Sequence, residues 1–482
     1  MTISNAAQSG LELHAQGRFA QALPLLASQP RSDSIAIHRA LADCYLHQGK
    51  VAEAVKHMDR VLATTPDDAN LQSLRLVSSY FDPNLSDSEI LNRHTDWARR
   101  FAGNFPPPNF GNSRDPDRKL RIGYLCSTIR SGVTMALFGP LLERHDRNQF
   151  AVSCYNNTPA PDDITQIVRS FADTWREIGH LSNDAAAELI RRDEIDILID
   201  LDLHLPPNRI GLIARQSAPV QAALIQYPGT SGLAAMDYIF TDRYMLTPRC
   251  ERFFAEKLVA IDTLWIFRPR GPGRAEEDSA YAVAPPPSLS KRYVTFGSLN
   301  NAPKINATLL RTWNQILLQI PNSRLLLQMK GSAGGEIQLL RECGLPLDRV
   351  DVIDSHPQVE YTRRYQQIDV ALDPFPYGGG GGTAMDALWA GLPLITLAGN
   401  RPTSRYGTSL LMNLGLPQFI AKTPEQYVEI AVSTAEDIVG RSELRRTLRT
   451  RMAESLLMNE TRYARQIEAG YRGMWKRWCG SF

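Results

Sequence analysis

Residues 373–391, DPFPYGGGGGTAMDALWAG, place five consecutive glycines between a short apolar run and a segment with the composition of a helix. The apolar run from Val370 to Leu372 is typical of a buried strand, and Gly391 is in position to end the helix. Thr383 and Asp386 have the spacing of a capping box, so we expect the helix to begin near Thr383. This stretch therefore predicts a strand, a glycine loop and a helix in succession.

A glycine loop that leads into a helix is a favourable place for an anion. Glycine lets backbone N–H groups approach a ligand closely, and a helix N-terminus carries about half a positive charge. We therefore expect a diphosphate group here, although glycine runs also occur as flexible loops. The lysine of a P-loop does not follow the glycines, and the acidic residue of a dinucleotide-binding fold is missing about 20 residues further on. A nucleotide sugar is the ligand class that remains.

Similar strand-like runs lie on both sides of this stretch and alternate with helical segments such as DAAAELIRRDE (184–194), which is typical of βαβ units. The expected strands are LRIGYLCS (120–127), FAVSCYN (150–156), IDILIDLDLH (195–204), VQAALIQYP (220–228), YVTFGSL (293–299), SRLLLQMK (323–330), VDVID (350–354), DVALDPF (369–375) and LPLITLA (392–398). Pro-rich breaks at residues 105–118 and 267–291 separate them into two series. We therefore expect two Rossmann-like α/β domains, residues 115–270 and 285–482, that face a ligand-binding cleft.

Residues 1–104 have the composition of an all-α segment. Within it, a first copy of a helical pattern, GLELHAQGRFAQALPLL (10–26), is followed by a second copy, ALADCYLHQGKVAEAVKHMDRVLATTPDD (40–68). Ala42, Gly49, Ala54 and Pro66 fall at the offsets of a tetratricopeptide repeat, whose small residues let two helices approach closely. We expect a short tetratricopeptide-like segment and a linker helix that pack on the rest of the chain, because two repeats are fewer than independent stability requires. A plain helical hairpin is the alternative.

Composition narrows the class of protein. The chain has 482 residues, of which 43% are hydrophobic, and a formal net charge of +2 without a long run of one sign. Neither nucleic acid nor a membrane is therefore an obvious partner. The six cysteines are scattered without a C-x-x-C pair, and no export signal or long apolar segment is visible. We therefore expect a cytoplasmic protein.

The carboxylate pair Asp200 and Asp202 is the one sequence feature that suggests a metal ion. Two acids at the end of a buried strand are more often structural, so we expect no metal site.

Several long motifs, in order, resemble the O-GlcNAc transferase and SPINDLY family of protein glycosyltransferases from about residue 78 onward. They include RIGYLCS, QYPGTSGLAAMDYIFTD, FAEKLVAI, VTFGSLNNAPKI and the glycine-rich stretch itself. The resemblance implies a GT-B fold behind tetratricopeptide repeats and an inverting transfer from a nucleotide sugar to Ser or Thr hydroxyls of proteins. We expect UDP-GlcNAc as donor, no metal or other cofactor, and a protein acceptor presented by the repeat segment. A homodimer is compatible with this interpretation.

The resemblance also implies roles for individual residues. Lys304, in NNAPKI, matches the family lysine that meets the donor diphosphate, where an ammonium neutralises charge on the leaving group. The expected donor-binding residues are Asn301, Gly381, Gly382, Thr383 and Asp386 on the phosphate and ribose side, Tyr361 and Arg364 at the base end, and Gly229, Thr230 and Ser231 beside the sugar.

His204, in DLDLHLPPNR, falls where bacterial relatives carry Gly-His-Thr. A histidine at a strand end can act as an acid or base near neutral pH, or it can be a satisfied residue behind the site. Both alternatives are open at this point. Elsewhere the family's histidines are replaced, by Gly132, Gly381 and Tyr361.

Two other functions stay open beside the transfer of GlcNAc. The donor could be GDP-fucose, as in plant SPINDLY proteins, or another nucleotide sugar, with a flagellar or surface protein as acceptor. The lost histidines could instead mark a pseudoenzyme that binds partners through its repeats. Retention of Lys304, Thr383 and Asp386 argues against the pseudoenzyme, because decay usually reaches the phosphate site as well.

Overall fold

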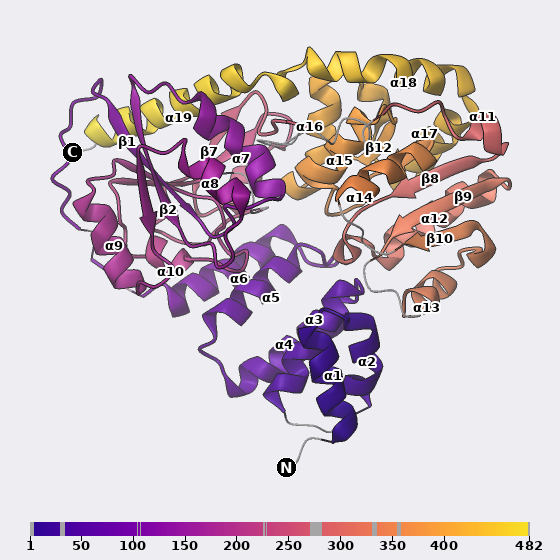
Figure 1. The fold of residues 1–482 in the computed structure, drawn as a ribbon, viewed down its shortest axis with the longest axis horizontal. Coiled ribbons are helices and arrows are strands. Elements are labelled where there is room, and N and C mark those ends of the chain that lie inside the picture. Colours follow the sequence, from indigo (N-terminus) through magenta and orange to yellow (C-terminus); the bar gives the residue numbers. More distant parts are fainter. Residues whose placement is uncertain are drawn as a thin grey trace. The chain divides into compact units, whose positions relative to one another are not determined.

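The computed structural model describes residues 4–480 apart from 29–33, 104, 107, 225–226, 228, 270–281, 330–334 and 354–357. The chain divides into two compact units, and each is assembled from separate stretches of sequence. The first unit comprises residues 1–71, 78–84 and 276–452, and the second comprises 72–77, 85–275 and 453–482. Figure 1 shows a sheet with covering helices in each unit.

The second unit is built on a seven-stranded parallel sheet in the order β3-β2-β1-β4-β5-β6-β7. Every residue of β4 and β5 is buried, as is typical of central strands in a parallel sheet that is covered on both faces. The strand order reverses between β1 and β4, where doubly wound sheets bind ligands. The strands are β1 (Leu120–Cys126), β2 (Phe150–Asn156), β3 (Thr174–Glu177), β4 (Ile197–Asp200), β5 (Val220–Ala223), β6 (Tyr238–Asp242) and β7 (Lys257–Ile261). The helices that follow them include α7 (Val133–Arg144), α8 (Asp163–Arg169), α9 (Asn183–Arg192) and α10 (Ile210–Ile213).

The C-terminal helix α19 (Glu460–Gly480) belongs to the second unit, although residues 276–452 before it belong to the first. It packs on α7, β5 and β7. Its buried side chains Tyr463, Ile467, Tyr471 and Met474 recur at helical spacing and form one apolar face. The units therefore differ from the continuous division 1–104, 115–270 and 285–482 expected from the sequence, because this face is buried against the sheet of the second unit.

The first unit is built on a six-stranded parallel sheet in the order β10-β9-β8-β11-β12-β13. The fully buried rings of Phe296, Trp313 and Tyr427 lie in its core. The strands are β8 (Val294–Ser298), β9 (Ser323–Gln328), β10 (Val350–Ile353), β11 (Val370–Leu372), β12 (Leu394–Leu397) and β13 (Ile420–Ala421). Its principal helices are α12 (Ala307–Gln319), α13 (Gly335–Glu342), α14 (Gln358–Arg364), α15 (Gly380–Trp389), α16 (Tyr406–Asn413), α17 (Pro424–Glu436) and α18 (Ile438–Ala453).

The N-terminal helical segment also belongs to the first unit. Its two hairpins are α1 (Asn5–Ala15) with α2 (Phe19–Ala27) and α3 (Ile35–His47) with α4 (Val51–Thr64). The turn inside each hairpin contains a glycine with left-handed backbone, Gly17 at φ +72° and Gly49 at φ +73°. The helices α5 (Ala69–Ser79) and α6 (Asp87–Phe101) follow, and Ser86 and Glu89 form a capping box at the start of α6.

The predicted fold class is confirmed: two parallel Rossmann-like sheets follow an all-α segment. Each predicted strand is present, although residues 225–226, 228, 330 and 354 of the predicted runs lie outside the described residues. The sequence analysis did not predict β3, β6, β7 or β13. Residues 270–281 of the Pro-rich connector at 267–291 also lie outside the described residues.

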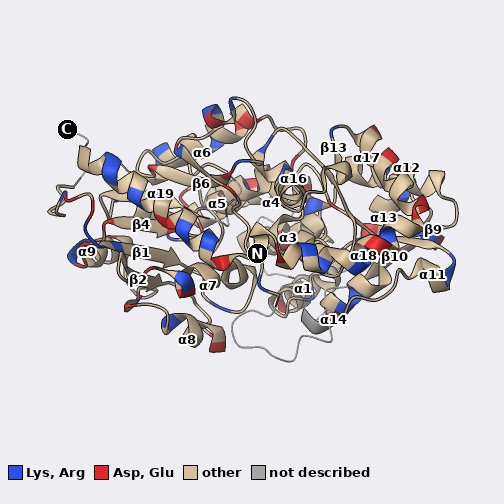
Figure 2. Ribbon diagram, turned by 90° about the horizontal axis from the view of Figure 1, so that it is seen from above, with Lys and Arg blue, Asp and Glu red and all other residues tan. Residues whose placement is uncertain are grey.

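Charged residues of both signs are spread over the helices, as Figure 2 shows for α18 and α19. Among the helices described, none combines the length and apolar character needed to cross a membrane.

Candidate functional site

Two loops of the first unit follow adjacent strands at the point where the strand order reverses. β8 pairs with β11, with Phe296 opposite Val370 and Gly297 opposite Ala371. The 3-10 turn η3 (Ala302–Lys304) follows β8, and the glycine loop follows β11. Because ligands of doubly wound sheets bind outside the carboxyl ends of such strands, these loops are the candidate donor site.

Lys304 lies against the glycine loop. Its Nζ donates a hydrogen bond of 2.8 Å to the carbonyl oxygen of Gly378 and lies 4.7 Å from the centroid of the Tyr377 ring. Burial lowers the pKa of Lys304 to about 8, and the nearby Asp373 carboxyl opposes that shift. The ammonium is therefore mostly charged at neutral pH and stands beside the predicted diphosphate loop.

Asp373 holds the glycine loop from beneath. The N–H of Gly379 donates to its Oδ1 at 2.6 Å, and the Thr396 hydroxyl donates to its Oδ2 at 2.7 Å. The residue is fully buried, and burial raises the pKa of its carboxyl, against these hydrogen bonds and Lys304. A Cβ atom on Gly379 would come within 2.7 Å of Oδ1, and Gly380 has a φ of +72°. At these two positions the run requires glycine, for close approach and for left-handed backbone.

The predicted capping box at Thr383 and Asp386 is wrong. Helix α15 begins at Gly380 with Gly379 as its N-cap, so Thr383 is already the fourth helical residue. The first turn contains three glycines because the loop enters the helix earlier than the polar residues suggest. The first four N–H groups of a helix have no partner within it, and here glycines leave most of them unshielded by side chains. The predicted helix end is confirmed, since Gly391 follows the helix at φ +83°.

Of the two residues expected at the base end, Tyr361 is connected to α15 through Tyr365. The hydroxyls of Tyr361 and Tyr365 lie 2.6 Å apart, and Tyr365 donates to the carbonyl oxygen of Thr383 at 3.1 Å. Arg364 forms an ion pair of 2.8 Å with Glu360 on its own helix. Tyr365 thus links Tyr361 to Thr383, two residues that the sequence analysis assigned to one site.

Asn301 and Asp386 lie in different environments. Asn301 is exposed, whereas Asp386 is buried. The neighbour of Asn301, Asn300, is buried and donates to the Ser298 hydroxyl at 3.1 Å. A Cβ atom on Gly379 would lie 3.3 Å from Asn300 Oδ1, so this amide also faces the glycine loop.

In the second unit, a buried carboxylate organises the turn that contains Gly229, Thr230 and Ser231. Glu256 accepts 2.8 Å and 2.7 Å hydrogen bonds from the Thr230 hydroxyl and the Ser231 N–H, and the Ser231 hydroxyl also donates to it. Burial raises the pKa of Glu256, while these hydrogen bonds oppose the shift. Both side chains of this turn are therefore occupied in shaping its backbone, and Gly229 is buried beside them.

Both ring nitrogens of His204 are already in use. Nε2 lies 2.8 Å from the carbonyl oxygen of Ser231, and Nδ1 lies 3.2 Å from the Ser73 hydroxyl. Because a carbonyl can only accept, Nε2 carries the proton and Nδ1 accepts from Ser73. Burial, together with His94, holds the pKa of His204 well below its usual value. The geometry favours the alternative of a satisfied residue behind the site and gives no support to a general base at this position.

The two acids before His204 are also buried. Asp202 accepts a 2.5 Å hydrogen bond from the Ser127 N–H, and Asp200 accepts from the N–H groups of Asp202 and Leu203 at 2.8 Å and 3.2 Å. Burial raises the pKa of Asp200 to about 6 and that of Asp202 above its usual value. Within the described residues, no group of three or more His, Cys, Asp or Glu side chains is arranged to hold a metal ion.

Gly132, at one position where the family has histidine, is the N-cap of α7. Its φ of +150° favours glycine, and the following residue, Val133, is 56% exposed.

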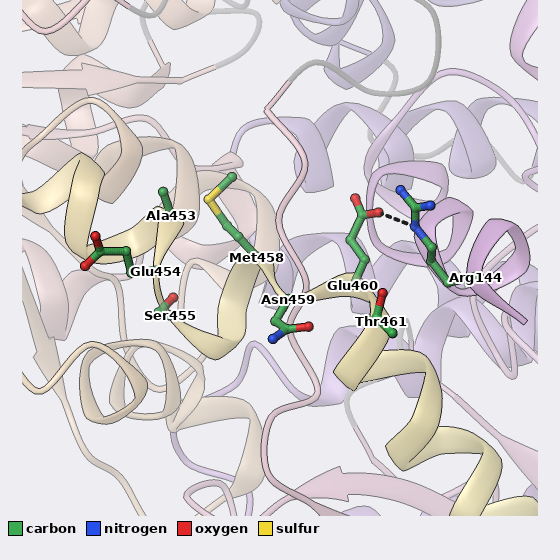
Figure 3. Close-up of a pocket in the computed structure, with 8 residues that line it drawn as sticks. All are labelled: Arg144, Ala453, Glu454, Ser455, Met458, Asn459, Glu460 and Thr461. Carbon is green, nitrogen blue, oxygen red and sulfur yellow. Dashed lines mark hydrogen bonds and ion pairs between the residues drawn. The ribbon is translucent and has the colours of Figure 1, made fainter.

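The second unit also contains a hollow of about 380 Å³, which is lined by none of the predicted site residues (Figure 3). Glu460 in its wall accepts from Arg144 at 3.0 Å and from Arg268 at 2.6 Å, so the Glu460 carboxylate is already paired. The hollow is lined by Arg144, Ala453, Glu454, Ser455, Met458, Asn459, Glu460 and Thr461.

Sequence reasoning missed four polar residues that hold the site together: Asp373, Tyr365, Tyr377 and Glu256. Asp373 directly follows a buried strand and precedes the glycines, which is a signal that could have identified it. Glu256 has no comparable local signal, because its partners lie 25 and 26 residues earlier in the chain.

Comparison with known proteins agrees with the family suggested by the motifs. The protein family described as Glycosyl transferase family 41 matches residues 104–267 and 287–467. The tetratricopeptide repeat family matches residues 13–76. A relative from Solanum lycopersicum, named as a probable UDP-N-acetylglucosamine–peptide N-acetylglucosaminyltransferase SPINDLY, is 32% identical over 432 residues. That alignment covers 87% of this chain and 45% of the relative. The Arabidopsis thaliana protein of the same name is 32% identical over 86% of this chain and 46% of its own length. The chain therefore spans about half the length of the curated relatives that it matches.

Solved structures show the same relationship. A mutant of the Thermobaculum terrenum O-GlcNAc transferase superposes with a TM-score of 0.89 at 30% identity and covers 98% of this chain and 91% of its own. A sucrose-phosphate synthase from Thermosynechococcus elongatus shares the fold alone, with a TM-score of 0.51 at 14% identity over 74% of this chain and 100% of its own. On these matches, the chain belongs to glycosyl transferase family 41.

Proposed function

We propose that this protein transfers GlcNAc from UDP-GlcNAc to Ser or Thr hydroxyls of proteins, with inversion at the anomeric carbon and without a metal ion. The acceptor oxygen forms a bond to the anomeric carbon as the bond from that carbon to the diphosphate breaks. The hydroxyl proton leaves to solvent or to a phosphate oxygen of the donor. His204 is not given this role, because both of its ring nitrogens are engaged.

The observation that carries this proposal is the meeting of Lys304 with the glycine loop at Gly378. The lysine ammonium and the glycine-lined N-terminus of α15 are two positive groups beside one loop. Charge develops on the diphosphate as it departs, and preorganised positive groups stabilise that charge. We assign the phosphate side of the donor to Lys304, Gly381, Gly382 and Thr383.

The other sequence-based assignments follow the same proposal. Asp386 would lie on the ribose side, and Tyr361 and Arg364 would bind the base. Support comes from the connection of Tyr361 through Tyr365 to Thr383. Gly229, Thr230 and Ser231 are assigned to the sugar, and the Glu256 hydrogen bonds would keep their turn in one conformation. Asn301 is exposed, and it stays a candidate for a phosphate contact.

The proposal of UDP-GlcNAc as donor and of a protein as acceptor is based on the names of the related proteins. Those from Solanum lycopersicum and Arabidopsis thaliana are named as probable UDP-GlcNAc–peptide transferases. The repeats would present the acceptor protein. We also place the enzyme in the cytosol, which is supported by the six free cysteine thiols in the described chain.

Nucleotide binding is tested by titration calorimetry of the full chain with UDP and with GDP, each with and without a chelator. We expect UDP to bind more tightly than GDP and the chelator to have no effect. Tighter binding of GDP would move the donor to the GDP-sugar alternative. Loss of UDP binding on chelation would refute the metal-free mechanism.

Transfer is tested by mass spectrometry of Ser- and Thr-containing peptides and candidate proteins after incubation with a panel of nucleotide sugars. A mass increase of one N-acetylhexosamine on Ser or Thr is the expected result. Nucleotide binding without transfer to any acceptor or to water would favour the pseudoenzyme.

A further inference from the structure

The second helical hairpin touches the turn that carries Lys304. Gly49, between α3 and α4, approaches the backbone of Ala302 so closely that a Cβ atom would lie 2.5 Å from the Ala302 carbonyl oxygen and 3.1 Å from its carbon. Ala302 begins η3 and Lys304 ends it. The hairpin and η3 both belong to the first unit. A displacement of the hairpin turn would therefore press directly on the backbone that carries the lysine.

The same lysine has a second neighbour linked to the helical segment. The Phe81 ring, between α5 and α6, stacks on the Tyr377 ring with centroids 4.8 Å apart and an angle of 20°. Lys304 Nζ lies 4.7 Å from the centroid of that Tyr377 ring. A stacked ring restricts the movement of Tyr377 and so the position of the aromatic surface that the ammonium contacts.

Tyr80, the residue before Phe81, is a second aromatic residue of this segment. It is buried, and its hydroxyl acts electrostatically on Tyr406, whose pKa is raised chiefly by burial. Tyr406 in turn packs edge-on against Tyr377 at 5.9 Å. The segment around Phe81 therefore meets, through the stacked Phe81 ring, a pair of aromatic side chains beside the glycine loop, Tyr377 and Tyr406.

The first hairpin offers a direct comparison. Gly17 occupies the same kind of turn, with φ +72° against +73° for Gly49, but an added Cβ atom there would meet nothing within 4 Å. The left-handed backbone is thus common to both turns, and the close approach belongs to the second one. What distinguishes Gly49 is its contact with η3.

We propose that the helical segment is part of the donor site, with Gly49 and Phe81 as positioning residues that hold Lys304 against the glycine loop. This inference rests on the proposed function of Lys304 at the donor diphosphate. It differs from the expectation that the repeats only present the acceptor. It predicts that damage to the helical segment weakens nucleotide binding even when no acceptor protein is present.

The experiment compares Gly49→Ala with Gly17→Ala in the full chain. Both substitutions impose left-handed strain on alanine, so thermal unfolding should show similar losses from that source. Only Gly49→Ala pushes on η3. We expect it to weaken UDP binding by at least about tenfold and to lower kcat by up to about a hundredfold, since small misplacements of a catalytic group have effects of this order. We expect Gly17→Ala to retain the parent values.

A pH profile separates positioning from general destabilisation. Loosening η3 admits water to Lys304, so its lowered pKa returns upward and the alkaline limb of kcat/KM moves to higher pH. Phe81→Leu should move the limb in the same direction, and Phe81→Tyr should restore the parent profile because it keeps the ring. The Phe81 pair carries the test if Gly49→Ala does not fold.

The outcomes distinguish this inference from the proposed function. If neither UDP nor GDP binds the parent protein, both are overturned. If the parent binds UDP and Lys304→Ala weakens that binding, but Gly49→Ala matches Gly17→Ala and Phe81→Leu matches the parent, only the role of the helical segment is overturned.

Discussion

Raising the pH through 8 should switch off catalysis through one side chain. Burial lowers the pKa of Lys304 to about 8, so the free enzyme loses this ammonium in a range where ordinary lysines keep theirs. The protonated form is the active one in our mechanism. The activity is therefore complete well below pH 8 and declines as the pH rises through that value.

The size of the decline follows from the same pKa. Half of the free enzyme has a neutral lysine at the pKa, and above it kcat/KM should fall by about tenfold for each pH unit. The bound donor is an anion that favours the charged lysine, so the limb for kcat should lie at higher pH than the limb for kcat/KM. Removing the ammonium altogether, in Lys304→Ala, should cost on the order of 3 kcal/mol of transition-state stabilisation, or about a hundredfold or more in rate.

The assay is the initial rate of peptide glycosylation from pH 6 to 10, with circular dichroism at each pH to confirm that the protein stays folded. Lys304→Ala should give a low rate without the alkaline limb. Lys304→Arg should also lack the limb, because a guanidinium stays charged over this range, although its shape would not restore the parent rate. A parent limb that persists unchanged in Lys304→Ala would refute the assignment of the limb to this lysine.

Substitutions at three further positions test the residues around Lys304 and around the turn at residues 229–231. Asp373→Asn removes a carboxyl that raises the pKa of Lys304, so the alkaline limb of kcat/KM should move to lower pH; a limb that stays at the parent pH would contradict this coupling. His204→Ala should lower the free energy of unfolding by about 2–4 kcal/mol, through a cavity and lost hydrogen bonds, with UDP affinity and kcat retained at temperatures where the variant is folded. His204→Gln should recover part of that stability, and a large loss of kcat in both variants with unchanged melting temperature would instead identify a chemical role. Glu256→Gln should destabilise the second unit by about 2 kcal/mol, because a buried carboxylate that accepts from Thr230 and Ser231 is replaced by a neutral amide. Thermal unfolding measures this loss, and an unchanged melting temperature would show that the carboxylate is not needed for the turn.

The elements with local signals could be predicted from the sequence alone. β11 could be predicted because Val370, Ala371 and Leu372 form an apolar run, and the glycines after it mark a loop. The helix end at Gly391 follows from the need for left-handed backbone at that point. The family was also readable from the sequence, because long motifs occur in a fixed order. In contrast, β3 was not predicted, since its residues are only partly buried and lack a continuous apolar pattern.

How these local elements are held in place depends on tertiary packing. The Thr396 hydroxyl at Asp373 beneath the glycine loop, Glu256 beneath Ser231 and Ser73 at Nδ1 of His204 all depend on residues that packing brings together from separate stretches of chain. The start of α15 at Gly380 also depends on that support, because glycine has little helical preference of its own. Periodicity and turn chemistry act between near neighbours in sequence, whereas hydrogen-bond saturation, burial and the pKa values that follow from them are properties of the folded neighbourhood.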